Sequence, residues 1–216
     1  MNIVIIGGRG NGTVIASTIE DCVKLGKIKV EKICFLNDFE KEVNDYPVVG
    51  KIRNNDWRKL SDDFQFIYAM SNIKQAKERN DLLLNLEIPT KRFINIFHPS
   101  AVISNKAKIG NGIVVMPHAL IGPNVSIEDH ALIYGQSFIG HDTKIGKMVF
   151  VANNVSIGGR VNIKQGAHIG SNASILERVN IGQFAICGLG SVVLNNVNDY
   201  ETVVGNPARV LEKSNK

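Results

Sequence analysis

Long hydrophobic runs, aromatic side chains and paired cysteines are all scarce in this chain of 216 residues. The apolar stretch in the opening MNIVIIGG is too short for a signal peptide or a membrane span, and no later run is long enough, so we expect no membrane insertion. The three cysteines, Cys22, Cys34 and Cys187, form no C-x-x-C motif, and their number is odd. Both features favour a reducing cytoplasm over an oxidising compartment.

A strongly charged surface of one sign is also missing. The net charge is +5, but the basic residues form no stripe interleaved with aromatics, which argues against nucleic-acid binding. This modest charge suits solubility or the attraction of small polyanions such as nucleotides. With 6% aromatics and 20 glycines, the composition indicates a β-rich repeat with many tight turns.

Residues 1–97 alternate between short apolar stretches and segments with helical apolar spacing. This alternation predicts a small parallel sheet with crossover helices. Ser71 is the expected N-cap of the second helix. Strands are expected at 2–7, 31–38, 63–70 and 91–99, and helices at 12–26 and 71–88.

Residues 98–197 follow a different pattern, in which an apolar residue recurs at every sixth position. Sixteen successive members of this series are apolar, and fifteen of them are Ile or Val. The residue two places before each member is Ala, Ser, Thr or Val, apart from Ile113. The series consists of Ile103, Ile109, Val115, Ile121, Ile127, Ile133, Ile139, Ile145, Val151, Ile157, Ile163, Ile169, Ile175, Ile181, Cys187 and Val193.

This hexapeptide repeat predicts a parallel β-helix. Three hexads make one triangular coil of 18 residues, with the aliphatic side chains inside. Glycines often follow the aliphatic positions, and we expect them to turn the corners with unusual backbone angles. Residues 18 apart then stack on neighbouring coils at ~4.8 Å. Residues 198–216 leave the repeat as a C-terminal tail.

Five short motifs occur in order along the chain. They are IGGRGNG at 6–12, FLNDF at 35–39, MSN at 70–72, IGHD at 139–142 and VVGNPAR at 203–209. With the repeat, they make the chain resemble the nucleotide-sugar acetyltransferases of the bacillosamine and perosamine N-acetyltransferase type, which are close to the sialic-acid O-acetyltransferases. The resemblance implies a Rossmann-like nucleotide-sugar-binding domain at 1–97, a left-handed β-helix acetyltransferase domain at 98–197, acetyl-CoA as co-substrate, and a homotrimer.

The resemblance also implies that the glycine-rich loop and the residues after the second strand hold the nucleotide. A glycine-rich turn that opens a helix offers N–H groups to phosphate, and the loop is not G-x-G-x-x-G, which disfavours a dinucleotide. Asn11 stands where the family often has histidine, which argues against proton chemistry at that position. From the residues alone, the alternative is a plain strand-to-helix turn. The residues that the resemblance points to are Gly7, Gly8, Gly10, Asn11, Gly12, Asn37 and Asp38, with Ser71 and Asn72 as further contacts.

By the same resemblance, His141 matches the general base and Asp142 the acidic neighbour that orients it. An amine that attacks a thioester must lose a proton, and histidine titrates in a suitable range. From the residues alone, the alternative is an exposed corner histidine beside a solvated aspartate. Phe150 stands where a second histidine is common in the family, and His168, one coil further, is the candidate substitute.

Coil stacking suggests where acetyl-CoA would bind. Gly159 stacks one coil beyond His141, so its backbone N–H is a candidate donor to the acetyl oxygen. Asn153, Ser171 and Leu189 form a second column, along which we expect the coenzyme in a groove between subunits. In the tail, Arg209 or Lys213 is a candidate for contact with its phosphates, and a solvated tail is the alternative.

No metal site is expected. His118, His130 and His141 are 12 and 11 residues apart, which places them at different positions around the coil, and there is no His-x4-His pair.

The predicted function is acetyl-CoA-dependent N-acetylation of a nucleotide-linked amino sugar, such as a 4-amino-4,6-dideoxy sugar, by direct transfer. Two alternatives stay open. One is a sugar O-acetyltransferase of the same fold, because the sequence does not separate amine from hydroxyl acceptors. The other is a non-catalytic β-helical module that binds a nucleotide sugar.

Overall fold

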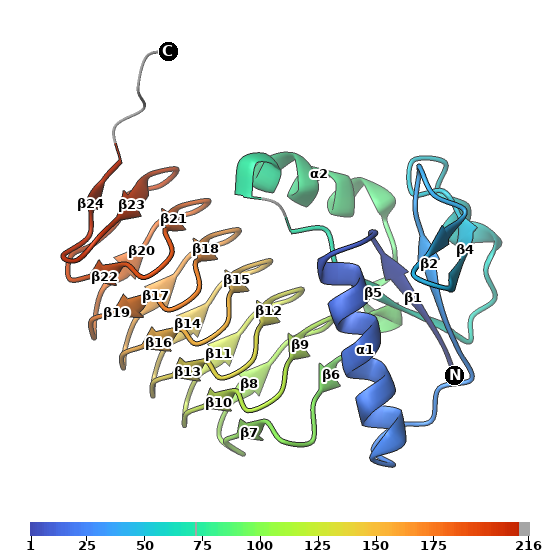
Figure 1. Ribbon diagram of the computed structural model, residues 1–216, viewed down its shortest axis with the longest axis horizontal. Coiled ribbons are helices and arrows are strands. Elements are labelled where there is room, and N and C mark those ends of the chain that lie inside the picture. Colours follow the sequence, from blue (N-terminus) through green and yellow to red (C-terminus); the bar gives the residue numbers. More distant parts are fainter. Residues whose placement is uncertain (72, 212–216) are drawn as a thin grey trace. The chain divides into compact units, whose positions relative to one another are not determined.

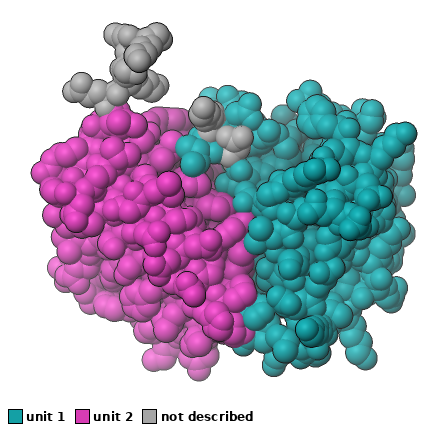
Figure 2. Space-filling model, in the orientation of Figure 1, with its two compact units in different colours: residues 1–99, 111–114 teal, residues 100–110, 115–216 magenta. Residues whose placement is uncertain are grey.

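The structure is a computed structural model that describes residues 1–71 and 73–211. The chain divides into two compact units, which Figure 2 colours separately. The first unit comprises residues 1–99 and 111–114, and the second comprises residues 100–110 and the chain from 115 onward. Among the described residues, no helix combines the length and apolar character needed to cross a membrane.

The first unit is built on a sheet with the strand order β3-β4-β2-β1-β5 (Figure 1). All neighbours run parallel except β3, which pairs antiparallel with β4. The apolar runs of β1, β2 and β5 are almost wholly buried, as a parallel sheet requires. The bounds are β1 (Asn2–Ile6), β2 (Lys32–Leu36), β3 (Glu42–Val43), β4 (Tyr46–Gly50) and β5 (Phe64–Tyr68), followed by β6 (Ile96–Phe97).

Helix α1 (Asn11–Lys24) begins directly after the glycine-rich loop and buries Ile15 and Ile19. Gly12 lies in its first turn and packs against the core, since a β-carbon there would lie 2.8 Å from Cε1 of Phe35. Gly12 therefore allows α1 to approach the sheet closely.

Helix α2 (Ala76–Leu86) starts later than predicted. The N-cap is Gln75, so the prediction of Ser71 as N-cap was wrong. The reason is a short 3-10 helix at Ile73–Gln75 that precedes α2. Other 3-10 helices are at Asp56–Lys59 and Thr90–Arg92, and the second of these shortens the strand predicted at 91–99 to the two residues of β6.

The second unit is a parallel β-helix with three faces, each a ladder of short strands (Figure 1). The first face contains β7 (Val102–Ile103), β10 (Leu120–Ile121), β13 (Phe138–Ile139), β16 (Ser156–Ile157), β19 (Ser174–Ile175) and β22 (Val192–Val193). The second face contains β8 (Lys108–Ile109), β11 (Ser126–Ile127), β14 (Lys144–Ile145), β17 (Asn162–Ile163) and β20 (Asn180–Ile181). The third face contains β12 (Leu132–Ile133), β15 (Phe150–Val151), β18 (His168–Ile169), β21 (Ile186–Cys187), β23 (Thr202–Val204) and β24 (Arg209–Val210). Strand β9 (Val114–Val115) lies at the sequence boundary of the two units.

The hexapeptide series fills the interior of this prism. Neighbouring coils pair residues 18 apart, as in Ile121 with Ile139 and Ile139 with Ile157. From Val115 to Val193 every member of the series is at most 4% exposed. The prediction of an α/β unit followed by a parallel β-helix is therefore confirmed.

The glycines after the aliphatic positions do not turn the corners, so that part of the prediction was wrong. Positive φ angles fall two residues further on, for example at Asn124, Asp142 and Arg160, with φ of 59°, 59° and 58°. The glycines instead allow close stacking, because a β-carbon on Gly140 would lie 2.6 Å from the carbonyl carbon of Gly158.

The chain continues the third face beyond residue 197. Strand β23 pairs parallel with β21, although the register there joins Ile186 to Thr202. Strand β24 then pairs antiparallel with β23, after a turn that contains Gly205 and Pro207. The segment predicted as a tail thus ends the prism with a short hairpin.

Candidate active site

His141 and Asp142 occupy the corner between β13 of the first face and β14 of the second. The φ of 59° at Asp142 places its carboxylate beside the imidazole, with 2.7 Å between His141 Nδ1 and Asp142 Oδ2. The two side chains are 47% and 40% exposed, so the pair is open to solvent. Although successive residues on a strand point apart, this corner brings the two together.

The charge on Asp142 determines which imidazole nitrogen carries the proton. Hydrogen bonds from His141 and then from Asn124 hold the pKa of the Asp142 carboxyl below its usual value. An ionised carboxylate only accepts hydrogen bonds, so we assign the imidazole proton to Nδ1. Nε2 then carries the lone pair and can accept a proton from a substrate.

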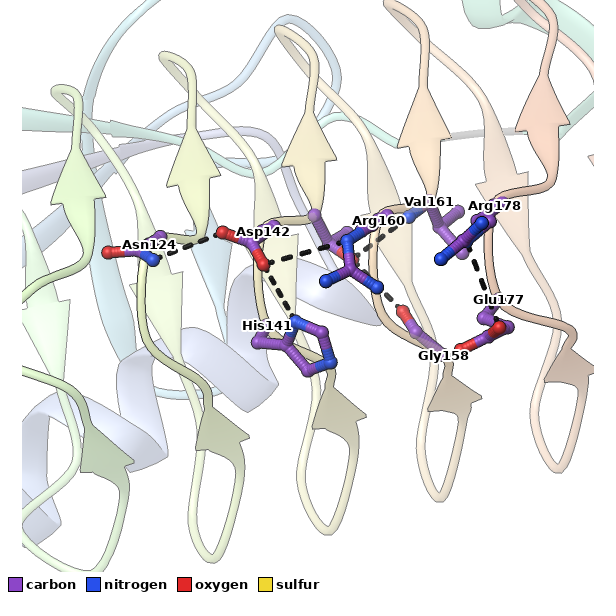
Figure 3. A network of polar contacts seen from close by, with 9 residues as sticks. Asn124, His141, Asp142, Gly158, Arg160, Val161, Glu177 and Arg178 are labelled. Carbon is purple, nitrogen blue, oxygen red and sulfur yellow. Dashed lines mark hydrogen bonds and ion pairs between the residues drawn. The ribbon is translucent and has the colours of Figure 1, made fainter.

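The next coil supports this pair from one side (Figure 3). Gly159 lies against the imidazole, because a β-carbon on it would be 2.7 Å from His141 Nε2. The Arg160 N–H donates to the His141 carbonyl at 2.8 Å, and Arg160 Nε lies 4.0 Å from Asp142 Oδ2. The previous coil supports the other side, where Asn124 Nδ2 donates to Asp142 Oδ1 at 3.0 Å.

The predicted coenzyme column lies at a different corner of the prism. Asn153, Ser171 and Leu189 stack as expected, since the carbonyls of Asn153 and Ser171 accept N–H groups of the next coils at 3.1 and 2.9 Å. Leu189 is 78% exposed. This corner joins the third face to the first, and the five residues 154–158, which include β16, separate Asn153 from Gly159 along the chain. Within one chain the two predicted parts of the acetyl-CoA site therefore lie at opposite edges of the first face.

Phe150 and His168 lie on the third face, away from the corner of His141. Their rings stack with centroids 4.7 Å apart and planes 2° apart. Within one chain, His168 consequently cannot take the place of a second histidine beside His141. Among the described residues, no group of three or more His, Cys, Asp or Glu side chains is arranged to hold a metal ion.

The first unit contains a cavity of about 460 Å³ at the end of its sheet where β1, β2 and β5 finish. Seven of the nine residues predicted to bind the nucleotide line it. Gly12 instead packs in the core, and Asn72 lies outside the described residues. The lining consists of Gly7, Gly8, Arg9, Gly10, Asn11, Asn37, Asp38, Phe39, Ile52, Arg53, Ala69, Met70, Ser71 and Arg79.

Asn37 shapes the wall of this cavity through the backbone. It is 8% exposed, its amide donates to the Gly7 carbonyl at 2.9 Å, and its Oδ1 accepts the N–H groups of Phe39 and Glu40 at 2.8 and 2.9 Å. Gly8 leaves room for this amide, since a β-carbon on Gly8 would lie 2.7 Å from Asn37 Nδ2.

The carboxylate of Asp38 is hydrogen-bonded to the backbone of Arg53 and forms an ion pair with its side chain. The Arg53 N–H donates to Asp38 Oδ1 at 3.0 Å, and Arg53 Nε lies 3.5 Å from Oδ2. Asn11 reaches across the cavity to the Ser71 carbonyl at 3.3 Å. Both contacts join loops that are far apart in sequence.

Sequence reasoning missed four residues that give the cavity its chemistry. Three are the arginines Arg9, Arg53 and Arg79, and the fourth is Phe39, whose side chain is 87% exposed. Arg9 lies inside the glycine-rich loop, which was a usable signal. Arg53 and Arg79 follow no motif and reach the cavity only through the fold. In the tail, Arg209 donates to the Ala208 carbonyl, and Lys213 lies outside the described residues.

Comparison with known proteins accords with this two-part architecture. Residues 2–79 match the PglD N-terminal domain family. Over 97% of the chain, the fold matches 98% of the acetyltransferase domain of PglB from Neisseria gonorrhoeae, solved with acetyl coenzyme A, at 26% identity and a TM-score of 0.83. WeeI from Acinetobacter baumannii matches at 27% identity and a TM-score of 0.82, with 98% and 100% of the two chains covered.

A third solved structure is PerB from Caulobacter crescentus, in complex with CoA and GDP-perosamine. It matches at 25% identity and a TM-score of 0.61, with 98% of each chain covered. No curated protein sequence matches the chain.

The fold is that of acetyltransferases of the hexapeptide-repeat class, with an α/β unit ahead of a parallel β-helix. These matches support the sequence resemblance to the nucleotide-sugar acetyltransferases.

Proposed function

We propose that the protein transfers an acetyl group from acetyl-CoA to the amino group of a nucleotide-linked amino sugar, with His141 as general base. The observation that carries this proposal is the 2.7 Å contact between His141 Nδ1 and Asp142 Oδ2, which leaves Nε2 available for the amine proton. The amine nitrogen attacks the thioester carbonyl, the carbon–sulfur bond breaks, and the imidazolium returns its proton to the departing thiolate. The Gly159 N–H is the proposed donor to the carbonyl oxygen.

The cavity of the first unit is the proposed site for the nucleotide. Its arginines, Arg9, Arg53 and Arg79, provide cationic groups for a diphosphate, and the start of α1 provides backbone N–H groups. Phe39 offers an exposed ring on which a base can stack. Arg9 is paired with Glu40 at 2.9 Å, so a phosphate would compete with this carboxylate.

The acetyl-CoA site is proposed to form between copies of the chain. The column of Asn153, Ser171 and Leu189 and the corner of His141 border the same first face, so a second copy seated on this face would bring one of each together. The outer side chains of that face, Val102, Leu120 and Phe138, are 61%, 40% and 44% exposed. These side chains form a continuous apolar ladder, which favours a homotrimer with three shared grooves.

The cytoplasm is the proposed location, because the protein needs no disulfide. Cys22, Cys34 and Cys187 are all buried and free. Free thiols persist in a reducing compartment.

The test is a mass-spectrometric screen of the purified protein with acetyl-CoA and a panel of nucleotide 4-amino sugars, each paired with its 4-hydroxy analogue. We expect acetylation of an amine, and a loss of about 100-fold or more in kcat for His141→Ala. The matched control is His118→Asn, which alters another exposed corner histidine with positive φ, at 60°.

Each alternative has its own signature in this screen. Acetylation of the hydroxyl analogue would identify an O-acetyltransferase. Binding of a nucleotide sugar with no turnover would favour a non-catalytic module. A His141→Ala variant with near wild-type kcat would remove His141 as the base.

A further inference from the structure

One interior column of the prism contains a single hydroxyl group. Its members precede the aliphatic residues of the second face by two positions, and all but one are aliphatic. The exception is Thr143, whose residue is fully buried at 0% exposure. A hydroxyl in such an interior is costly unless it is hydrogen-bonded. The column consists of Ala107, Val125, Thr143, Val161 and Val179.

Thr143 makes two hydrogen bonds, and both go to the next coil. Its Oγ1 donates to the Gly158 carbonyl at 3.0 Å and accepts the Val161 N–H at 3.2 Å. The two partners stand at the start and end of one corner, residues 158–161. The Thr143 side chain therefore joins both ends of that corner, which an isosteric valine could not do.

This corner is the one that supports the His141 and Asp142 pair (Figure 3). It carries Gly159, which lies against the imidazole, and Arg160, whose N–H holds the His141 carbonyl at 2.8 Å. Arg160 also places a guanidinium 4.0 Å from Asp142 Oδ2. A shift of the corner would change both the packing of the ring and the charge beside its carboxylate partner.

We propose that Thr143 is a positioning residue, which fixes corner 158–161 against His141 and Asp142 by tying the two coils together. Asn124 holds Asp142 from the opposite coil, with its amide 3.0 Å from Oδ1. His141 and Asp142 thus have supporting contacts from both neighbouring coils, and Thr143 fixes the position of the coil that contacts the imidazole. The kinetic part of this inference rests on the proposed acetyl transfer, whereas the position of the ring can be measured without a substrate.

The test compares Thr143→Val with Thr143→Ser in the full-length protein. Valine matches threonine in shape and occurs in three other coils of the column, so we expect the variant to fold. We expect a modestly lower Tm, because the Val161 N–H and the Gly158 carbonyl lose their hydrogen-bond partner. We expect its kcat to fall about tenfold or more with little change in KM, because misplaced reacting groups lose rate rather than affinity. Thr143→Ser keeps the hydroxyl and is expected to restore kcat.

The second readout is the NMR spectrum of the imidazoles, which is simple because the chain has 5 histidines. We expect the His141 ring signals, assigned with His141→Asn, to shift in Thr143→Val and to stay in place in Thr143→Ser. Ser137→Ala is the matched control, since it removes another buried hydroxyl of the same coil that bonds to the Tyr134 carbonyl instead.

The possible results separate this inference from the proposed function. Wild-type kcat and wild-type His141 signals in Thr143→Val would overturn the positioning role. If Thr143→Val does not fold, unchanged His141 signals in a folded Thr143→Ala variant would overturn it equally. Shifted signals without acetyl transfer by the wild-type protein would support the positioning role and refute the proposed function.

Discussion

At the scale of single residues, the imidazole of His141 depends on a neighbour with no side chain. Gly159 is buried under the ring, and a β-carbon on it would lie 2.7 Å from Nε2 and 2.9 Å from Cε1. The backbone φ of Gly159 is not in the left-handed region, so glycine is required here for space and not for backbone freedom.

We therefore expect Gly159→Ala to displace the imidazole without unfolding the coil. The predicted result is a kcat lower by about 10- to 100-fold, with the Tm nearly unchanged, because the ring can rotate toward solvent while the backbone stays in place. Steady-state kinetics and thermal melting check this. Glu177→Ala, in the same corner column one coil further, is the control that should leave both values near wild type. Unaltered turnover in Gly159→Ala would show that the ring does not act from its observed position.

At the scale of elements, the third face carries a column of aromatic rings. Tyr134 and Phe150 have ring centroids 4.8 Å apart, and Phe150 and His168 stack at 4.7 Å. Burial lowers the pKa of His168 to about 4 from an ordinary value of 6.5. The pKa of His130 is lowered to about 4 as well, chiefly by burial.

Because of these two lowered pKa values, we expect the free energy of unfolding to decrease in acid. Each is neutral above pH 6.5 in both states, so its contribution is fully present there. As the pH falls from 6.5 toward 4, the unfolded chain takes up a proton that the folded chain resists, and the free energy of unfolding falls by at most about 1.4 kcal/mol per pH unit for each histidine. Denaturant titrations at pH 7 and pH 5 measure this.

The variant that checks this prediction is His168→Phe, which continues the stack without a titratable group. We expect a shallower pH dependence of unfolding for this variant, with His130 retaining its share. An equal slope for wild type and variant would mean that His168 is protonated in the fold.

At the scale of the whole molecule, the apolar ladder of the first face is the strongest indication of self-association. Val102, Leu120 and Phe138 occupy successive coils and stay exposed in the single chain. A flat strand ladder of this kind suits a second copy of the chain, because flat faces pack closely over a large area.

We expect the wild-type protein to sediment as a trimer and Phe138→Glu to sediment as a monomer, because the interface would bury an unpaired carboxylate. The monomer should keep nucleotide binding in its first unit and lose acetyl transfer, since the proposed coenzyme groove needs two copies. Analytical ultracentrifugation and calorimetry provide the measurements. Leu84→Glu, which charges a 65% exposed leucine of α2, is the control. A monomeric wild-type protein with full activity would contradict the shared groove.

Local signals accounted for most of what could be predicted from the sequence. The glycine-rich loop and the hexapeptide series are visible in short windows, and the structure places them at a cavity and in the prism interior. The Ser71 cap failed because a 3-10 helix competes with the first turn of α2. Arg53 and Arg79 were not predicted because they belong to no sequence motif. The turn after β4 carries Arg53 to the cavity, and helix α2 carries Arg79.

By itself the sequence determined the frame of the second unit. An aliphatic residue at every sixth position is buried when three hexads form one triangular coil. That arrangement places residues 18 apart on adjacent coils. Only the tertiary structure decided how the corners meet. The contact of Gly159 with the imidazole and the two hydrogen bonds of Thr143 depend on the closure of a whole coil, which places one corner against the next. No pattern along the chain encodes that fit, because it arises from the packing of every interior side chain between the two corners.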